Sequence, residues 1–337
     1  MNHPQRLAAF VALGRRLATI SSDELASLAA RARNQNAWFD EPSVRAAIAG
    51  IAHMLAEEPL QHWASRYPAE PTTVHKVGVV MAGNIPMVGF HDLLCVLMSG
   101  HILLAKLSAD DTVLMTWMME ELTRAEPRFA DFIQVLPRLN AADAFIATGS
   151  DNTARYFDHY FGKKPNLIRR NRTSVAVLTG AETSAELTQL GSDIFQYYGL
   201  GCRNVSKLFV PTNYDFVPLL DALQVYEDVL HHHKYNNNYD YNKSILLVNR
   251  VPHFDNGFFL ITRDPQLVSP ISMVYYAEYC SEIDLVDQLT DVAARTQVVM
   301  SAGGHFAGSV LFGRAQQPGV HEYADGVDTM TFLASLK

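Results

Sequence analysis

Cysteine is scarce in this sequence: its 337 residues include three cysteines, and no two of them form a Cys-X-X-Cys pair. A disulfide framework or a cysteine-based zinc site is therefore not expected. Thiols outside disulfides fit a reducing cytoplasm. Long apolar runs are also missing, since no stretch of about 20 uninterrupted apolar residues could span a membrane. The segment Met1–Arg6 lacks the apolar core of a signal peptide. We therefore expect a cytoplasmic protein without a membrane span.

Excess positive charge and the common nucleotide-binding motifs are absent as well. The formal net charge of -8 argues against nucleic acid as a partner. Neither a Gly-X-Gly-X-X-Gly motif nor a Walker motif occurs. The consecutive histidines 231–233 would point in different directions on a helix, so we expect no metal site there.

The composition, 48% hydrophobic and 18% charged, is typical of a soluble globular protein. A chain of this length is expected to form about two domains. We predict a helical N-terminus and a dinucleotide-binding domain over residues 1–180. A catalytic domain would follow over 181–320, and a C-terminal tail over 321–337.

Residues 4–67 show apolar residues at helical spacing, and the period changes at Thr73. From there strands alternate with helices, which is typical of a doubly wound, mostly parallel sheet in an α/β fold. We predict its strands at 77–81, 102–106, 132–136, 144–147 and 175–178. A second α/β segment is predicted from Lys207 to about Leu311. Its strands are expected at 208–210, 245–248, 258–261, 273–276, 297–300 and 310–312. The polar stretch 231–239 is expected to be the end of a surface helix running into a loop.

The segment Tyr197–Pro211 holds the strongest candidate for chemistry. Gly199 and Gly201 favour a tight turn, Cys202 follows directly, and an apolar strand comes next. A cysteine on such a turn is accessible and has neighbouring backbone N–H groups, as nucleophilic attack on an acyl carbon requires. The alternative is that Cys202 is a small buried apolar residue.

Three further positions fall where predicted strands end, the edge at which parallel sheets bind ligands. Asn84 follows the first strand and could donate its amide to an oxyanion, or simply tolerate a turn conformation. Lys106 ends the second strand and suits a ribose or phosphate, or is an ordinary solvated strand end. Thr148-Gly149-Ser150 precedes a helix and could offer N–H groups to a phosphate, or serve as an N-cap.

Together these residues resemble the aldehyde dehydrogenase superfamily. Its members carry an Asn-X-Pro turn, a lysine at a strand end, a Gly-Ser helix start and a cysteine in a glycine-containing turn. Here these are Asn84-Ile85-Pro86, Lys106, Gly149-Ser150 and Gly201-Cys202, in the same order. Within the superfamily, the chain looks most like the acyl-CoA reductases related to the fatty acid reductase of bacterial luminescence. The segments that carry this likeness are 77–101, 198–211 and 312–329.

The resemblance implies an aldehyde dehydrogenase-like fold and a role for each matching residue. Cys202 would be the nucleophile, and Asn84 with the Cys202 backbone N–H would form the oxyanion hole. Lys106 would bind the adenosine ribose or its 2′-phosphate, and Thr148, Gly149 and Ser150 would lie near the pyrophosphate. Gln266 stands where the family has a glutamate that holds the nicotinamide ribose.

One departure from the superfamily bears on the reaction. Hydrolytic aldehyde dehydrogenases carry a glutamate base near the position of Ile168–Arg172, whereas this chain has no acidic residue between Asp158 and Glu182. Without a base to activate water, an acyl-enzyme should exchange with coenzyme A. The resemblance therefore implies reduction of an acyl-CoA, expected to be fatty, to the aldehyde. NADPH is the preferred cofactor, with NADH as the alternative and coenzyme A as the leaving group.

Two other functions stay open from the sequence. One is reduction of an acyl phosphate to a semialdehyde, and the other is a non-catalytic nucleotide-binding relative that acts as a partner subunit. The resemblance also implies a homodimer or a larger homo-oligomer.

Overall fold

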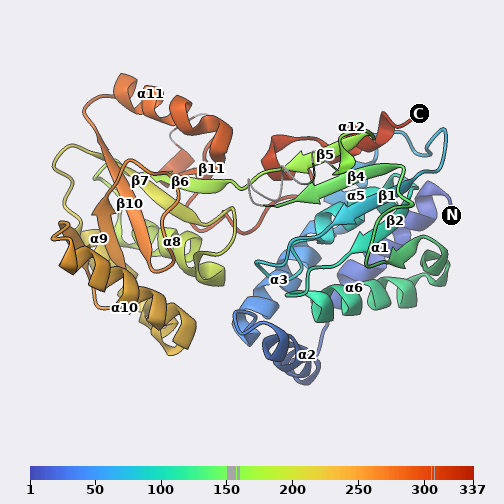
Figure 1. The fold of residues 1–337 in the computed structure, drawn as a ribbon, viewed down its shortest axis with the longest axis horizontal. Coiled ribbons are helices and arrows are strands. Elements are labelled where there is room, and N and C mark those ends of the chain that lie inside the picture. The colour runs from blue at the N-terminus through green and yellow to red at the C-terminus, as the bar shows by residue number, and fades with distance from the viewer. Residues whose placement is uncertain (150–156, 158–159, 305, 307) are drawn as a thin grey trace. The chain divides into compact units, whose positions relative to one another are not determined.

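The computed structural model describes residues 1–149, 157, 160–304, 306 and 308–337 (Figure 1). The chain forms two units. Unit 1 comprises residues Met1–Asn171 and Gln317–Lys337, and unit 2 comprises residues Arg172–Gln316.

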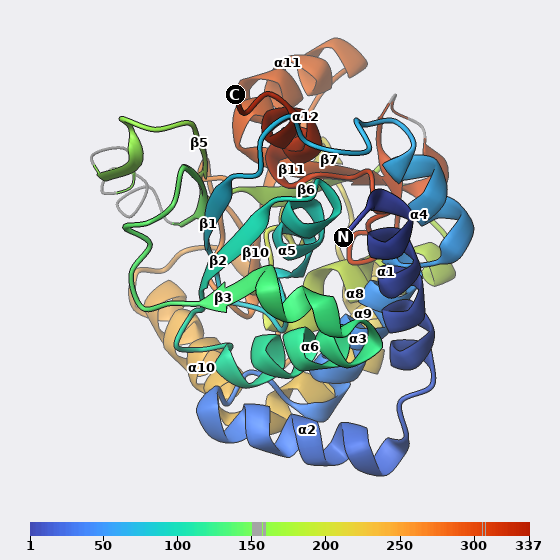
Figure 2. The same ribbon diagram turned by 90° about the vertical axis from the view of Figure 1, so that its right-hand side faces the viewer.

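The N-terminal region is helical, as predicted. Its helices are α1 (His3–Ala18), α2 (Ser22–Gln35), α3 (Glu41–Met54) and α4 (Glu57–Ala64). The first three begin at side chains that accept a backbone N–H of the first turn, namely those of Asn2, Ser21 and Asp40. Helix α1 packs against α3 and against α6 (Thr112–Ala125) of the sheet region (Figure 2). These helices therefore form a layer of unit 1.

Unit 1 is built on a five-stranded parallel sheet with the order β3-β2-β1-β4-β5. The strands are β1 (Lys76–Val80), β2 (Ile102–Lys106), β3 (Ile133–Val135), β4 (Ala144–Thr148) and β5 (Asn166–Arg169). Helix α5 (Phe90–Met98) connects β1 to β2, and α6 with the 3-10 helix η1 (Pro127–Asp131) connects β2 to β3. The chain runs outward from β1 to β3 and then returns to β4 on the other side of β1. The neighbouring strands β1 and β4 thus flank a topological switch point, the preferred ligand position of such sheets.

The fifth strand of this sheet differs from the prediction. We predicted 175–178, but that segment belongs to β6 (Thr173–Val177), which pairs with β7 and β11 in unit 2. The fifth strand is β5, whose side chains are mostly half-buried. Its sequence Asn166-Leu167-Ile168-Arg169 is short and mixed in polarity, so its pattern gave no strong strand signal. Unit 2 accordingly begins at Arg172, before the predicted boundary after residue 180.

The C-terminal segment belongs to unit 1. It contains the 3-10 helix η6 (Ala324–Gly326) and helix α12 (Thr329–Ala334), which packs on α5. Trp63 Nε1 donates to the hydroxyl of Tyr323 at 2.7 Å, and the Tyr67 hydroxyl donates to Asp328 at 2.8 Å. These contacts explain why residues 317–337 are an integral part of unit 1.

Unit 2 holds a seven-stranded sheet with the order β12-β11-β6-β7-β10-β9-β8, in which only the β8–β9 pair is antiparallel. The strands after β6 are β7 (Val205–Pro211), β8 (His253–Asp255), β9 (Leu260–Arg263), β10 (Met273–Tyr279), β11 (Thr296–Ser301) and β12 (Val310–Leu311). Its α-helices are α8 (Ser184–Phe195), α9 (Val217–Leu223), α10 (His233–Val248) and α11 (Glu282–Val292). The 3-10 helices of this unit are η2 (Gln196–Gly199), η3 (Gln224–His231), η4 (Ala293–Arg295) and η5 (Ala302–Gly304). One core cluster joins Val175, Val177 and Phe209 of the central strands to Leu267 and Leu285.

Two predictions for unit 2 are wrong. Residues 245–248 form the last turn of α10 instead of a strand. The stretch 231–239 does contain the predicted helix end, that of η3 at His231, but the first turns of α10 stand where a loop was expected. A short apolar run cannot by itself distinguish a strand from part of a helix. Here Leu246 is buried, whereas Leu247 and Val248 are exposed, so the run does not lie inside a sheet. Within the described residues, no helix is both long and apolar enough to cross a membrane.

Candidate active site

The chain reverses direction between α8 and Cys202 through three residues with left-handed backbone. Their φ angles are 54° at Tyr197, 57° at Tyr198 and 79° at Gly199. Glycine adopts this conformation without cost, but each tyrosine pays about 1–2 kcal/mol. Strain of this kind persists only where the surrounding contacts enforce it, and it gathers at functional sites.

Cys202 lies in the turn that follows this reversal. The backbone N–H of Asn204 donates to the carbonyl of Gly201 at 3.0 Å, which places Cys202 and Arg203 at the two central positions of a β-turn. Cys202 is half-buried, and β7, the strand between β6 and β10, begins three residues later. The thiol therefore projects from a turn that is anchored to the middle of the unit 2 sheet.

The side chain of Asn204 holds this turn against the end of α8. Its Oδ1 accepts the Gly201 N–H at 2.8 Å, and its Nδ2 donates to the carbonyls of Asp193, Ile194 and Gln196 at 3.0, 3.3 and 2.8 Å. Helix C-termini leave carbonyl groups without an intrahelical donor, and Asn204 supplies donors to them. The sequence analysis missed this residue, although its place two positions after the candidate nucleophile was a usable signal.

The start of β6 holds the other side of the turn. Ser174 Oγ donates to the Cys202 carbonyl at 3.1 Å, and the Ser174 N–H donates to the Asn204 carbonyl at 3.1 Å. Ser174 is fully buried. The carbonyl side of the cysteine turn is thus fixed by the neighbouring strand.

Asp193 links the same helix end to the segment after β12. Its carboxylate accepts the N–H groups of Gly313 at 2.6 Å and Ala315 at 3.0 Å. Arg203, next to Cys202, donates to the Ala315 carbonyl at 3.1 Å. Burial raises the pKa of the Asp193 carboxyl to about 6, although the two N–H groups oppose that rise. Residues 313–315 are therefore positioned beside the cysteine turn.

Gln266 lies in the same unit as Cys202, in the loop after β9. Gln266 is exposed, and its backbone carbonyl accepts a hydrogen bond from Nζ of Lys207 at 3.1 Å. Lys207 also donates to the carbonyl of Asp264. This lysine is buried in β7, and burial lowers its pKa. The loop that carries Gln266 is thereby tied to the strand that follows the cysteine turn.

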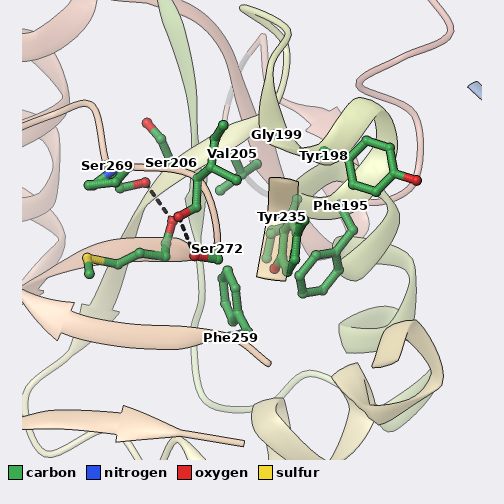
Figure 3. A pocket seen from close by; sticks show the side chains of 13 residues that line it. Phe195, Tyr198, Gly199, Val205, Ser206, Tyr235, Phe259, Ser269 and Ser272 are labelled. Carbon is green, nitrogen blue, oxygen red and sulfur yellow. Dashed lines mark hydrogen bonds between the residues drawn. The ribbon is translucent and has the colours of Figure 1, made fainter. Parts of the chain in front are cut away.

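A pocket lies beside the reversal that leads to Cys202 (Figure 3). The rings of Phe195, Tyr198 and Tyr235 gather on one side of it, and Ser206 and Ser269 lie on the other. Ser269 Oγ donates to the carbonyl of Met273 at 2.7 Å. The full lining is Ile194, Phe195, Tyr198, Gly199, Val205, Ser206, Tyr235, Phe259, Ser269, Pro270, Ile271, Ser272 and Met273. The reversal therefore has an aromatic wall on one side.

Asn84 lies in unit 1, on the turn after β1, and is exposed. The turn packs closely on the segment after β2, since a Cβ on Gly83 would approach the Ser108 Cβ to 2.6 Å. The turn ends at Met87, which has a left-handed φ of 56° and donates its N–H to Asp111 Oδ2 at 2.7 Å. Burial raises the pKa of Asp111 to about 8. The conformation of the Asn84 turn is thus set by residues that follow β2.

Lys106 and Thr148 lie at one edge of the unit 1 sheet, as predicted. Lys106 pairs with Val80, and Val80 pairs with Ala147, so the ends of β2, β1 and β4 are level. Lys106 is exposed and Thr148 is half-buried. The Gly149 N–H donates to the Arg169 carbonyl at 3.3 Å, so this amide already has an acceptor within the sheet. Ser150 lies outside the described residues.

The basic run 169–172 is divided between the two units. Arg169 is buried and donates to both carboxylate oxygens of Asp92 at 2.8 and 2.7 Å, and also to Thr329 Oγ1 at 2.6 Å. Arg172 belongs to unit 2 and donates to the carbonyl of Thr296. Arg169 therefore has a structural role inside unit 1.

The other two cysteines and the histidines fit the site less well. Cys95 is buried in α5, and burial raises its pKa well above the usual range. Cys280 is exposed and begins no strand. His91, in α5, contacts the Val320 carbonyl at 2.8 Å, and His305 lies outside the described residues. Over the ranges that the structure describes, no group of three or more His, Cys, Asp and Glu side chains could hold a metal ion.

Comparison with known proteins identifies the family. The model of the family described as acyl-CoA reductase (LuxC) matches residues 43–219, more than half of the chain. This range includes Asn84, Lys106 and the cysteine turn. No curated protein matches the sequence.

Several solved structures share the fold. Aldehyde dehydrogenase 21 from Physcomitrella patens, in complex with its reaction product succinate, has a TM-score of 0.70 and 11% identity. The alignment covers 99% of this chain and 84% of that one. An NADP-dependent enzyme from E. coli has a TM-score of 0.66 and 12% identity, with 92% and 77% covered. The aldehyde dehydrogenase of Mycobacterium tuberculosis complexed with NAD+ has a TM-score of 0.62 and 14% identity, with 89% and 73% covered. The predicted aldehyde dehydrogenase-like α/β fold with a helical N-terminus is confirmed.

Proposed function

The chain is an oxidoreductase of the acyl-CoA reductase (LuxC) family, and we propose that it reduces a fatty acyl-CoA to the aldehyde through an acyl-enzyme on Cys202. The observation that carries this proposal is the presentation of Cys202. Cys202 is half-buried and lies on a hydrogen-bonded turn directly before β7. Covalent catalysis by cysteine needs an accessible thiol in a fixed position.

The reaction would begin with attack of the Cys202 thiolate on the thioester carbonyl carbon. A new carbon–sulfur bond forms, the bond to the coenzyme A sulfur breaks, and coenzyme A leaves as a thiolate that takes up a proton. When bound, a reduced nicotinamide would supply the hydride that reduces the acyl-enzyme by two electrons. Cys202 then leaves as the thiolate and the aldehyde is released. Asn84 and the Cys202 N–H would stabilise the oxyanion of each addition step.

The residues of unit 1 suit a nicotinamide dinucleotide at the carboxyl edge of the sheet. Lys106 is exposed at that edge, level with the ends of β1 and β4. A lysine ammonium there can bind ribose hydroxyls or a phosphate. Thr148 and Gly149 would lie near the pyrophosphate, and Gln266 of unit 2 would hold the nicotinamide ribose. Since Arg169 is engaged with Asp92, preference for NADPH over NADH would rest on Lys106.

The missing glutamate supports transfer to coenzyme A over hydrolysis. The residues from the end of β5 to the start of β6 include no acid, because the first acidic residue after Asp158 is Glu182. A water molecule beside the acyl-enzyme would therefore lack a carboxylate base from this segment.

The test is aldehyde formation by purified protein supplied with fatty acyl-CoA and either NADPH or NADH. Cys202→Ala should abolish aldehyde formation and the acyl adduct seen by mass spectrometry of the intact chain. Cys280→Ala, at an exposed position, should keep both. If Cys202→Ala still forms aldehyde, the nucleophile assignment is wrong. An acyl phosphate supplied in parallel separates the two acyl donors, and light scattering after size exclusion tests the proposed homodimer.

A further inference from the structure

From the contacts of a single buried amide, we infer that Asn204 is the positioning residue of the Cys202 nucleophile. Asn204 is 2% exposed, and all the polar atoms of its side chain have partners. A carboxamide offers two N–H donors and one acceptor oxygen. Here the side-chain oxygen accepts a hydrogen bond from the cysteine turn, and the side-chain nitrogen donates to carbonyls at the end of α8. The inference rests on the proposed function, in which Cys202 is the group that attacks.

Asn204 forms two hydrogen bonds with the backbone of Gly201. Its backbone N–H donates to the Gly201 carbonyl at 3.0 Å, and its side-chain oxygen accepts the Gly201 N–H at 2.8 Å. Both peptide groups of the glycine that precedes Cys202 are therefore held by one residue. Because Cys202 follows Gly201 directly, its Cα–Cβ direction is set by these two bonds.

The nitrogen of the same amide holds the far end of the reversal. It donates to the carbonyls of Asp193, Ile194 and Gln196, with the shortest distance, 2.8 Å, to Gln196. Two hydrogens serve three acceptors, so these bonds are shared. Between Gln196 and Gly201 lie the left-handed residues Tyr197 and Tyr198. The Asn204 amide thus connects the two ends of the strained segment 196–201 through its hydrogen bonds. Without these bonds we expect the left-handed backbone of this segment to relax.

The turn has further support from Ser174, which bonds the carbonyls of Cys202 and Asn204. Loss of the Asn204 side chain should therefore leave unit 2 folded and the thiol present, while the direction of the thiol becomes less defined. Displacement of a reacting group by about 1 Å can cost about 100-fold in rate. The expected effect is on the rate of attack more than on binding of the acyl-CoA.

The experiment measures acyl-enzyme formation at saturating acyl-CoA in a single turnover, by mass spectrometry of quenched samples. Asn204→Ala should slow this step about 100-fold, while the KM for acyl-CoA changes only a few-fold. Alkylation of Cys202 by iodoacetamide should also change only a few-fold, with Cys280 of the same chain as the internal reference for an exposed thiol. A loss confined to acyl transfer separates positioning from general loss of structure.

Asn242→Ala is the matched control. Asn242 is 6% exposed in the same unit, and its Nδ2 donates to the Ile271 carbonyl at 2.9 Å. This variant should lower the Tm as Asn204→Ala does, without slowing acyl transfer. If Asn204→Ala does not fold, the Asn204→Asp variant tests whether Asn204 positions Cys202. It has the same size and keeps the acceptor for Gly201, but its carboxylate cannot donate to the three carbonyls, so it should also slow acyl transfer.

The outcomes separate this inference from the proposed function. If wild-type Cys202 takes up no acyl group, the proposed function fails. If the wild type is acylated and a folded Asn204 variant is acylated at the same rate, Asn204 is not the positioning residue. Equal slowing in Asn204→Ala and Asn242→Ala would likewise overturn the assignment.

Discussion

The buried carboxyl group of Asp111 accepts the backbone N–H of Met87 at 2.7 Å, while its second oxygen, Oδ1, is buried and has no hydrogen-bond partner among the described residues. Met87 ends the turn that carries Asn84, and it has a left-handed φ of 56°. A residue after β2 therefore holds the turn after β1. A carboxylate with one unsolvated, unbonded oxygen resists ionisation, and burial raises the pKa of Asp111 to about 8.

Asp111→Asn should reduce the pH dependence of stability. The unfolded chain releases the Asp111 proton near its ordinary pKa of about 3.9, whereas the folded protein keeps it until about pH 8. The stability contribution is thus fully present below about pH 4 and is lost as pH rises to about 8, at about 1.4 kcal/mol per pKa unit. Asparagine cannot ionise and can still accept the Met87 N–H. The Tm of the variant relative to wild type should therefore rise between pH 5 and 8.

The control for this prediction is Asp110→Asn, which removes the neighbouring carboxylate at an exposed position. Its Tm difference from wild type should not grow between pH 5 and 8. A Tm difference for Asp111→Asn that stays constant with pH would show that Asp111 is ionised in the folded protein at neutral pH.

Arg169→Met should destabilise unit 1. The change leaves the Asp92 carboxylate buried without its bidentate partner, and breaking a buried ion pair from one side costs about 3–5 kcal/mol. The double variant Asp92→Leu/Arg169→Met removes both charges and should recover much of the loss. Urea unfolding of the three proteins measures the difference. If the single and double variants are equally unstable, the charge pairing is not the cause.

Lys106→Ala should raise the KM for the cofactor about 10-fold or more while leaving the Tm within about 2 °C of wild type, because Lys106 is exposed. If Lys106 recognises the 2′-phosphate, the increase should be larger for NADPH than for NADH. Steady-state kinetics with both cofactors provides the measurement. Arg128→Ala, at an exposed basic residue of unit 1 paired with Glu126, is the control and should leave both KM values unchanged.

Lys207→Met should raise the same KM several-fold through Gln266. Methionine is unbranched like lysine but lacks the ammonium group, so it cannot donate to the carbonyls of Asp264 and Gln266. The loop after β9 then loses its connection to β7. Gln266→Ala should raise this KM to a similar degree, and the double variant should add little to either change. Additive effects of the two substitutions would show that Lys207 acts through another group.

Much of the secondary structure of unit 1 can be predicted from local sequence patterns. Apolar residues at helical spacing and side-chain caps place α1 to α3, and strand–helix alternation gives four of the five strands of its sheet. The positions of Asn84, Lys106 and Thr148 at strand ends follow from the same alternation, because parallel strands bring their carboxyl ends to one edge. The likeness of Gly201-Cys202 and its neighbours to a known family identified the cysteine turn, and the family match agrees.

Local sequence patterns gave wrong predictions for elements whose structure depends on contacts with residues far along the chain. The apolar residues 245–248 end a helix with two exposed side chains, and β5 is a strand of mixed polarity. The segment 173–177 joined the second sheet because β7 and β11 offer it partners from far along the chain. Pairing between strands depends on contacts that neighbouring residues do not encode.

The candidate nucleophile Cys202 and the missing glutamate can be identified from the sequence alone, because each depends on residue type and short-range spacing. The contacts that fix the cysteine turn, and the one that occupies Arg169, could be identified only from the tertiary structure. Asn204 reaches the end of α8, Ser174 reaches the cysteine turn from β6, and Arg169 is engaged by Asp92 from α5. Each of these bonds joins residues about 10 to 80 positions apart, and hydrogen-bond partners at such separations are selected by tertiary packing.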